Sequence, residues 1–169
     1  MDLSTATKLA KDIKTKILFF TLKKPKIKIV GSILRKELII NDIDLLVIDG
    51  DLTKLNLSRL TASGNLGKII VSGKKHVSFN YIMNKQTNQQ IRVDLFTCKS
   101  SELPYAMFHY TGNKDYNIRT RAHAKRMGYL LNQYGLFKNG VKLRLTNVKT
   151  ERDLAHILGL TFRKPSDRK

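Results

Sequence analysis

Apolar and polar residues alternate with two different periods in the first hundred residues, and these periods predict a helix followed by a sheet. Over 4–20 the apolar residues recur at helical spacing, and Ser4 or Thr5 is placed to cap the helix. Residues 52–60 predict a second, shorter helix. Five segments show the period of two that is typical of strands. They span 26–30, 42–48, 67–73, 76–83 and 90–96.

The pattern changes after Pro104, which marks the expected boundary of a first domain. Residues 105–112 predict an extended segment that runs to a glycine turn. Residues 115–127 predict a basic helix, closed by Gly128 in the position that favours glycine after a helix.

A small sheet and a last helix are expected beyond Gly128. Residues 129–145 predict the sheet, and the pair Asn139-Gly140 is a strong signal for a two-residue hairpin. Thr150 and Asp153 resemble a capping box that opens the helix. We therefore expect an α+β protein of two domains. They are 1–104 and 105–169.

The composition predicts a folded protein outside the secretory pathway. A hydrophobic content of 41% suits a chain with a packed core, and no apolar run approaches the ~18 residues that span a bilayer. The N-terminal segment MDLSTATKLAKDIKTK is too polar for a secretory signal, and Cys98 has no second cysteine for a disulfide. We therefore expect an intracellular protein without a membrane partner, in the cytoplasm or nucleus of a host cell, or in a virion if the chain is viral.

The excess of positive charge points to a polyanionic partner. Lysine and arginine number 32 against 13 aspartates and glutamates, a net charge of +19. Residues 1–104 carry 18 basic and 9 acidic side chains, and residues 105–169 carry 14 and 4. A solvated basic surface and an anionic membrane are the alternatives, but no basic amphipathic helix with a large apolar face supports the second. Nucleic acid is therefore the expected partner, held mainly by the second domain.

The stretch NDIDLLVI places two aspartates two positions apart on one predicted strand. Side chains at i and i+2 of a strand point the same way, so Asp42 and Asp44 lie side by side. Ile43 and Leu45 then face the core. Two carboxylates this close normally force one to stay protonated. A divalent cation removes the conflict, and oxygen ligands at a shallow site suit Mg²⁺.

A third carboxylate, Asp94, lies on the predicted strand IRVDLF. If that strand neighbours 42–48, three carboxylates converge and can hold two cations about 3.5–4 Å apart, an arrangement used for in-line phosphoryl transfer. Backbone amides at Gly31-Ser32, and the guanidinium of Arg35, are placed to bind triphosphate oxygens. The alternative is that each aspartate merely caps or ends its strand.

Gly-Ser followed by D-x-D resembles the signature of the nucleotidyltransferase superfamily. The segment YAMFHYTGNKDYNIRTRAHAKRMGYLLNQYGLF resembles the part of the family X DNA polymerases that holds the nascent base pair, and LGLTFRKPSDR resembles their closing motif. The likeness covers residues 26–169 and is weakest through 50–88. It implies a palm with a mixed β-sheet flanked by helices, and a smaller α/β, thumb-like C-terminal lobe. The implied function is template-directed addition of deoxynucleotides to a primer 3′-hydroxyl, as short-gap filling in DNA repair.

The resemblance also implies the metal chemistry. Asp42 and Asp44 would bridge two Mg²⁺ ions, for which Mn²⁺ is the expected substitute, and Asp94 would bind the ion at the primer 3′-hydroxyl. One cation would lower the pKa of that hydroxyl, and the other would neutralise charge on the triphosphate and on the leaving pyrophosphate.

Eight residues match nucleotide-binding positions of the family. They are Gly31, Ser32, Arg35, Asn41, His109, Tyr110, Gly112 and Asn117. Ser32 and Arg35 match contacts to the β- and γ-phosphates. Asn117 matches a residue that reads the minor-groove edge of the incoming base, and Tyr110 would discourage a ribose 2′-hydroxyl.

Asn117 and Arg121 are four positions apart on the predicted helix and share one face. Arg121 matches a residue that touches the template strand. Three more basic residues of the helix are expected to contact DNA, against the alternative of a solvated face. They are Arg119, Lys125 and Arg126. The sequence departs from the commoner family residue at Asn41, where relatives often have glycine, and at His109, where tyrosine is commoner.

The expected partners are gapped or primer-template DNA and deoxynucleoside triphosphates, bound by a monomer. Only 25 residues precede the first expected palm strand, so we expect no lyase activity of the family type. Two other functions stay open: nucleotidyl transfer to another acceptor, such as an untemplated end, an RNA or a small molecule, and a non-catalytic DNA-binding module. The basic second domain argues against the first, and the intact set of three aspartates argues against the second.

Overall fold

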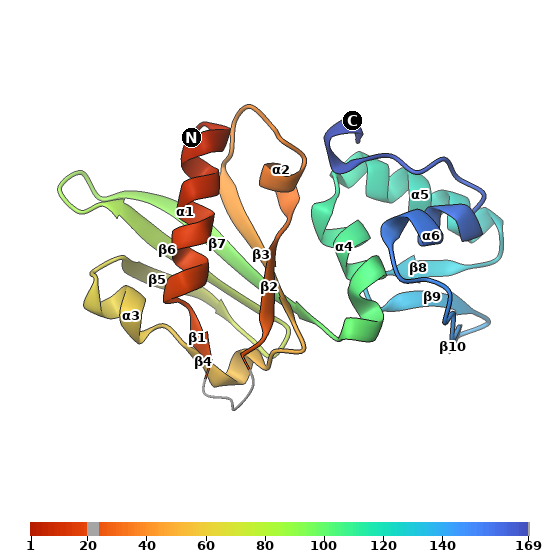
Figure 1. Cartoon of the computed structure of the whole chain (residues 1–169), viewed down its shortest axis with the longest axis horizontal. Helices are drawn as coiled ribbons and strands as arrows, with labels where there is room; N and C mark the ends of the chain where they lie inside the picture. Colours follow the sequence, from red (N-terminus) through yellow and green to blue (C-terminus); the bar gives the residue numbers. More distant parts are fainter. Residues whose placement is uncertain (20–23, 169) are drawn as a thin grey trace.

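The computed structural model describes residues 1–19 and 24–168, which fold into two lobes (Figure 1). The first lobe is built on a mixed five-stranded sheet in the order β2-β3-β7-β6-β5. Strands β3 and β7 run parallel, and the other neighbours are antiparallel. The five strands are β2 (Lys26–Ile29), β3 (Asp42–Ile48), β5 (Leu66–Ser72), β6 (His76–Asn84) and β7 (Gln89–Cys98). The five predicted strands are therefore confirmed to within two residues at each end.

Helix α1 (Leu3–Lys16) crosses one face of this sheet (Figure 1) and packs Ala6, Ala10 and Ile13 into its core. The predicted cap and end of this helix were wrong. Asp2 caps it by accepting a hydrogen bond from the Thr5 backbone N–H (2.9 Å), which leaves Ser4 and Thr5 inside the first turn. Helix α1 ends at Lys16 because the chain turns extended to form β1 (Leu18–Phe19). Phe20, the last residue of the predicted helix, lies outside the described residues.

The helix predicted over 52–60 is also wrong, because a strand interrupts it. A 3₁₀ turn, η1 (Leu52–Lys54), leads into β4 (Leu55–Asn56), which pairs antiparallel with β1. The Asn56 side chain then accepts a hydrogen bond from the backbone N–H of Ser58 (2.8 Å) and starts the short helix α3 (Ser58–Ala62). Leucine spacing alone does not show this pairing with a distant segment.

The second lobe combines helices with a three-stranded antiparallel sheet in the order β10-β9-β8. Its elements are α4 (Leu103–Thr111), α5 (Lys114–Arg126), β8 (Leu130–Asn132), β9 (Gly135–Lys138), β10 (Val141–Lys142) and α6 (Glu151–Ile157). The predicted hairpin is confirmed: Asn139 and Gly140 both have positive φ, 49° and 76°, as a primed two-residue turn requires. The capping box of Thr150 and Asp153 is confirmed as well.

Residues 105–112 were predicted to be extended, and this prediction was wrong. Residues 105–111 belong to helix α4, which has Pro104 in its first turn and ends at Gly112, with φ 64°. The helix is buried on two sides. Tyr105 and Phe108 lie in the core of the second lobe, while Ala106 packs against the sheet of the first. A helix buried all round has no polar stripe, so its sequence lacks the periodicity from which helices are predicted.

Helix α4 therefore joins the two lobes through a shared apolar cluster. Val30, Leu46 and Ile48 supply its part in the first lobe, with Ala106 and Tyr110 of α4 packed against them. None of the helices within 1–19 and 24–168 is long and apolar enough to cross a membrane.

Candidate active site

The sheet of the first lobe has one apolar face and one partly polar face. Along β3, Ile43 and Leu45 are fully buried in the core that α1 covers. Asp42 and Asp44 alternate with them and therefore point to the opposite face. Further along the same face, Leu46 and Ile48 are covered by α4. The two aspartates thus lie where this face is not sealed by the cluster that joins the lobes.

Asp94 meets this pair from the neighbouring strand. In the parallel register of β3 and β7, Asp44 lies directly beside Asp94, and Asp42 lies beside Arg92. Adjacent strands are separated by about 4.8 Å, so paired side chains on one face are in contact range. The expectation that the strand of Asp94 neighbours 42–48 is therefore confirmed.

Arg92 binds two of the three carboxylates. Its Nη2 donates to Oδ2 of Asp42 (3.0 Å), and its Nε donates to Oδ2 of Asp94 (2.8 Å). The other oxygen of Asp94, Oδ1, accepts a hydrogen bond from Nε2 of His76 on β6 (2.7 Å). Asp94 is only 7% exposed, so both of its oxygens are held in a largely dry setting.

Asp44 is the carboxyl group whose negative charge the nearby positive side chains do not balance. Burial, together with the negative charges of Asp42 and Asp94, raises the pKa of Asp44 to about 7. The positive charges of Arg92 and Arg35 act in the opposite direction without cancelling it. A carboxyl group in this setting favours a bound proton or a nearby cation at neutral pH.

The surroundings of Gly31 explain why the chain needs a glycine at this position, ahead of the D-x-D motif. Gly31 opens the four-residue helix α2 (Gly31–Leu34) with φ 64°, a conformation that residues with a side chain rarely adopt. A Cβ atom at this position would lie 1.9 Å from Oδ2 of Asp44. The Asp44 carboxylate thus lies directly against the backbone of Gly31, and any side chain there would displace it.

The donor set of this face fits a hard divalent cation. Its oxygen ligands carry negative charge, and Arg92 and Arg35 do not offset the burial of Asp44 and the charges of its acidic neighbours. Within the described residues, no three acidic, histidine or cysteine side chains converge on one point. A cation shared by Asp42 and Asp94 would compete with Arg92, since Arg92 occupies Oδ2 of both.

The predicted triphosphate contacts lie between the lobes. Nη1 of Arg35 donates to the carbonyl oxygen of Thr111 (2.5 Å) and lies 3.4 Å from the position of a Cβ built on Gly112. Nδ2 of Asn117 donates to the carbonyl of His109 (2.7 Å). Two polar atoms here, the hydroxyl Oγ of Ser32 and the acceptor Oδ1 of Asn117, are buried and without a hydrogen-bond partner among the described residues. Unpaired buried polar atoms are expensive, so a ligand that bonds to them would be favoured.

His109 and Arg121 form a pair on the second lobe. Nη2 of Arg121 donates to Nδ1 of His109 at 2.5 Å. Burial, and to a smaller extent the adjacent Arg121 charge, lower the pKa of His109 to about 4. His109 is therefore neutral at physiological pH, as an acceptor for Arg121 must be.

Tyr110 connects the second lobe to the carboxylate strands. Its ring stacks on Phe96 of β7 (centroids 4.2 Å, interplanar angle 16°), and Phe96 stacks in turn on His76 (4.7 Å, 18°). Burial raises the pKa of the Tyr110 hydroxyl to about 12. Two of the predicted site residues, Tyr110 and Asp94, are therefore linked through side chains that were not predicted.

The four basic residues of α5 point to two different sides of the helix. Arg119 and Arg126 line a cavity of about 500 Å³ with Thr161 and Arg163. Arg121 and Lys125 line another, of about 640 Å³, beside β8 and β9. Asn41, a predicted nucleotide contact, is exposed just before β3.

Sequence reasoning missed Arg92 and His76. Arg92 stands two positions before Asp94, so the rule that paired Asp42 with Asp44 also places Arg92 on the same face. His76 had no such signal, because only the register of β6 against β7 brings it to Asp94.

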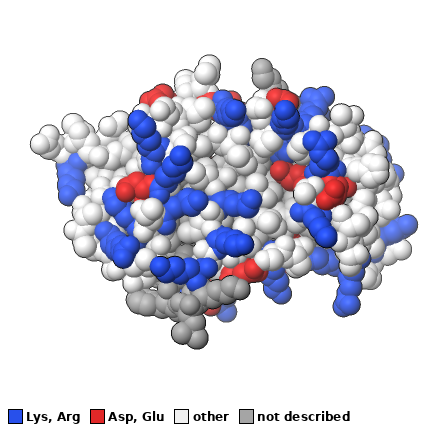
Figure 2. Space-filling view, in the orientation of Figure 1, with Lys and Arg blue, Asp and Glu red and all other residues white. Residues whose placement is uncertain are grey.

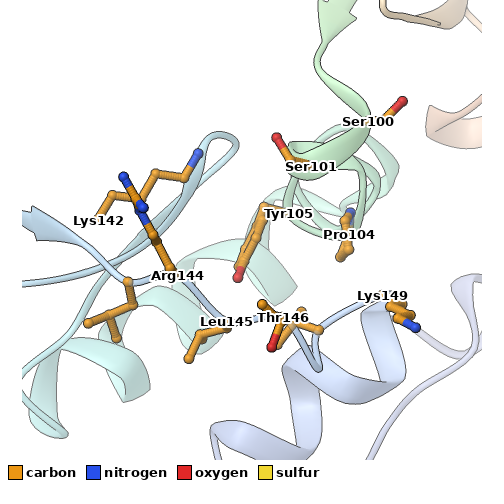
Figure 3. A pocket seen from close by; sticks show the side chains of 11 residues that line it. Ser100, Ser101, Pro104, Tyr105, Lys142, Arg144, Leu145, Thr146 and Lys149 are labelled. Atoms are coloured by element: carbon orange, nitrogen blue, oxygen red, sulfur yellow. The ribbon is translucent and has the colours of Figure 1, made fainter.

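A separate cavity of about 560 Å³ opens between the start of α4 and the segment 142–149 (Figure 3). Its walls carry basic and hydroxyl groups, including Lys142, Arg144 and Tyr105. None of the predicted site residues lines it, so it is not the site of the three aspartates.

Comparisons with known proteins agree with this geometry. Residues 106–169 match the family model described as DNA polymerase beta thumb. The Repair DNA polymerase X of African swine fever virus (isolate Pig/Kenya/KEN-50/1950) is 42% identical over 141 residues, which cover 82% of this chain and 79% of that protein. The protein of the same name from isolate Warthog/Namibia/Wart80/1980 is 36% identical over 169 residues, 95% of each chain. The ternary P/T complex of Leishmania infantum polymerase beta shares the fold, with a TM-score of 0.82 over 100% of this chain and 76% of that chain, at 22% identity.

Proposed function

This chain belongs to the family X DNA polymerases and is a DNA-directed DNA polymerase of DNA repair, and we propose that it fills short gaps by a two-metal-ion mechanism. We also propose that residues 1–104 form the catalytic palm and 105–169 a thumb-like lobe for the nascent base pair and DNA. The observation that carries the mechanism is the register of Asp44 beside Asp94 on one open face of the palm sheet.

Asp42, Asp44 and Asp94 would hold the two divalent cations, Mg²⁺ or Mn²⁺. When bound, the cations supply charge neutralisation on the triphosphate and lower the pKa of the primer 3′-hydroxyl. The carboxylates are already ordered on two hydrogen-bonded strands, so little rearrangement of the backbone is needed. Arg92 forms ion pairs with Asp42 and Asp94, and a cation at their Oδ2 atoms would have to displace it.

The chain's own residues would bind and orient the nucleotide between the lobes. Arg35, near Gly112, would contact the outer phosphates, and Ser32 Oγ, which has no hydrogen-bond partner among the described residues, would donate to them. Asn117, whose Nδ2 is fixed by the His109 carbonyl, would face the incoming base. The neutral His109 keeps Arg121 in place for the template strand.

Replacement of Tyr110 by alanine is expected to relax sugar selection. The stack on Phe96 fixes the Tyr110 ring, and its removal opens space at the proposed position of the 2′-carbon. We expect the preference for dNTP over rNTP to fall about 10- to 100-fold, which corresponds to about 1.4–2.7 kcal/mol. Single-nucleotide incorporation with dGTP and GTP at one gap measures it. A preference equal to that of the wild type would remove Tyr110 from the sugar contact, and Tyr129→Ala is the matched control.

DNA binding is expected to weaken steeply with salt. Lys and Arg side chains spread over both lobes on the face shown in Figure 2, and the whole chain carries +19. Contacts to about 6–10 phosphates would lower the affinity by roughly 10³- to 10⁵-fold between 50 and 200 mM salt. Fluorescence anisotropy with a gapped duplex across this range measures the slope. A nearly flat dependence would contradict binding through the basic surface.

The direct test of the function is extension of a primer at a one-nucleotide gap with Mg²⁺ and each dNTP in turn. Incorporation that follows the template base supports the proposal. Addition that is equally efficient without a template would instead favour a nucleotidyltransferase with another acceptor.

A further inference from the structure

Among the described residues, His76 makes the one side-chain hydrogen bond to the three aspartates that comes from outside their own two strands. It is the first residue of β6, and its Nε2 donates to Oδ1 of Asp94 at 2.7 Å. Its backbone is fixed as well, because its carbonyl accepts a hydrogen bond from Gly73 (2.9 Å) across the turn that joins β5 to β6.

Because β6 lies on the side of β7 away from β3, His76 reaches Asp94 from the side opposite to Asp42 and Asp44. Strand β7 lies between β3 and β6, so Asp94 has Asp42 and Asp44 on one side and His76 on the other. His76 holds the oxygen Oδ1, whereas Oδ2 is the oxygen that Arg92 joins to Asp42. With Oδ1 anchored toward β6, Oδ2 stays aimed at β3, where the proposed cations would bind.

The imidazole of His76 is also held in place by an aromatic ring. The His76 side chain is 37% exposed, so water competes with its hydrogen bond to Asp94. The imidazole ring stacks on Phe96 (4.7 Å, 18°), and Phe96 also stacks on Tyr110 of the second lobe (4.2 Å, 16°). The neighbouring Lys75 also reaches that lobe, with Nζ 5.9 Å from the centre of the Tyr134 ring.

We propose that His76 is a positioning residue that orients Asp94 for cation binding, seated on a ring stack that extends to Tyr110. The inference rests on the proposed function, because it assumes that Asp94 is a metal ligand. Groups that hydrogen-bond to a metal ligand fix its orientation, and their loss typically lowers metal affinity or activity 10- to 100-fold. Because the stack crosses between the lobes, the position of the second lobe and the orientation of Asp94 depend on each other.

Three substitutions separate the donor from the ring. His76→Gln keeps an N–H donor of similar reach, His76→Phe keeps a ring on Phe96 without a donor, and His76→Ala removes both. Mn²⁺ binding to the complex of each variant with gapped DNA, followed by the loss of the free-ion electron paramagnetic resonance signal, measures the effect without turnover. We expect Phe and Ala to weaken Mn²⁺ binding about 10- to 100-fold and Gln to stay within about 3-fold of the wild type. His156→Ala, an exposed histidine of α6, is the control and should bind as the wild type does.

Other outcomes are informative in different ways. Wild-type affinity in His76→Phe would overturn the positioning role. Equal losses in Gln and Phe, together with a lowered melting temperature, would make His76 a structural residue of the β5–β6 turn and would overturn it too. Asp94→Asn runs in parallel: if that variant also binds Mn²⁺ normally, the assignment of Asp94 as a ligand fails, which is a separate result.

Discussion

Asp94→Asn is expected to reduce nucleotide incorporation by roughly 10³-fold or more, about 4 kcal/mol of transition-state stabilisation. The substitution keeps the size of the side chain and removes its charge. An amide binds a divalent cation far more weakly than a carboxylate, and the barrier to attack by the primer hydroxyl rises accordingly. Single-turnover incorporation at a one-nucleotide gap with saturating Mg²⁺ measures the loss.

Two controls make this result specific to the site. Asp167→Asn removes an exposed carboxylate near the C-terminus and should leave incorporation unchanged. The DNA affinity of Asp94→Asn should stay close to that of the wild type. An Asp94→Asn enzyme that retains more than about a tenth of the rate would contradict the role of this carboxylate in the chemistry.

The second large effect is on the stability of the metal-free protein, which Asp44→Asn is expected to raise at high pH. The pKa of Asp44 is raised by burial, and by Asp42 and Asp94, from 3.8 to about 7. In the folded protein without metal, ionisation of this group is therefore less favourable than in the unfolded chain. Its cost is absent below about pH 4, grows as the pH rises toward 7, and is complete above 7. At pH 8 it amounts to roughly 2–4 kcal/mol, and Asp44→Asn removes it.

Thermal unfolding in EDTA, followed by circular dichroism, tests this expectation. At pH 8 the melting temperature of Asp44→Asn should exceed that of the wild type by several degrees, about 2–4 °C for each kcal/mol. At pH 4 the difference should largely disappear. The same variant should be inactive, so the group that destabilises the apo-protein is one that the chemistry needs. A variant that is less stable than the wild type at pH 8 would show that Asp44 is not under repulsion.

The strands of the palm sheet and the placement of their carboxylates were predictable because they depend on residues close together in the sequence. The i, i+2 rule placed Asp42 and Asp44 on one face, and the apolar residues between them fixed which face was buried. Asp94 was predicted from its place on the strand IRVDLF, and the structure brings it beside Asp44. Turn chemistry worked for the same reason at Asn139-Gly140, where two positive φ values are needed.

The errors share another cause, which is contact with distant parts of the chain. Helix α4 was missed because two cores bury it from opposite sides. The break within 52–60 depends on pairing between β4 and β1, more than thirty residues earlier. His76 reaches Asp94 only through the register of β6, which the local sequence of that strand does not encode.

Anomalous scattering from Mn²⁺ would test the central claim most directly. Crystals of the protein with gapped DNA and a non-hydrolysable dNTP, grown with Mn²⁺, would give the positions of the ions. We expect two peaks about 3.5–4 Å apart, both in contact with Asp42 and Asp44 and one of them also with Asp94. Ions bound only to the triphosphate, with Asp94 still held by Arg92 and away from both peaks, would contradict the account.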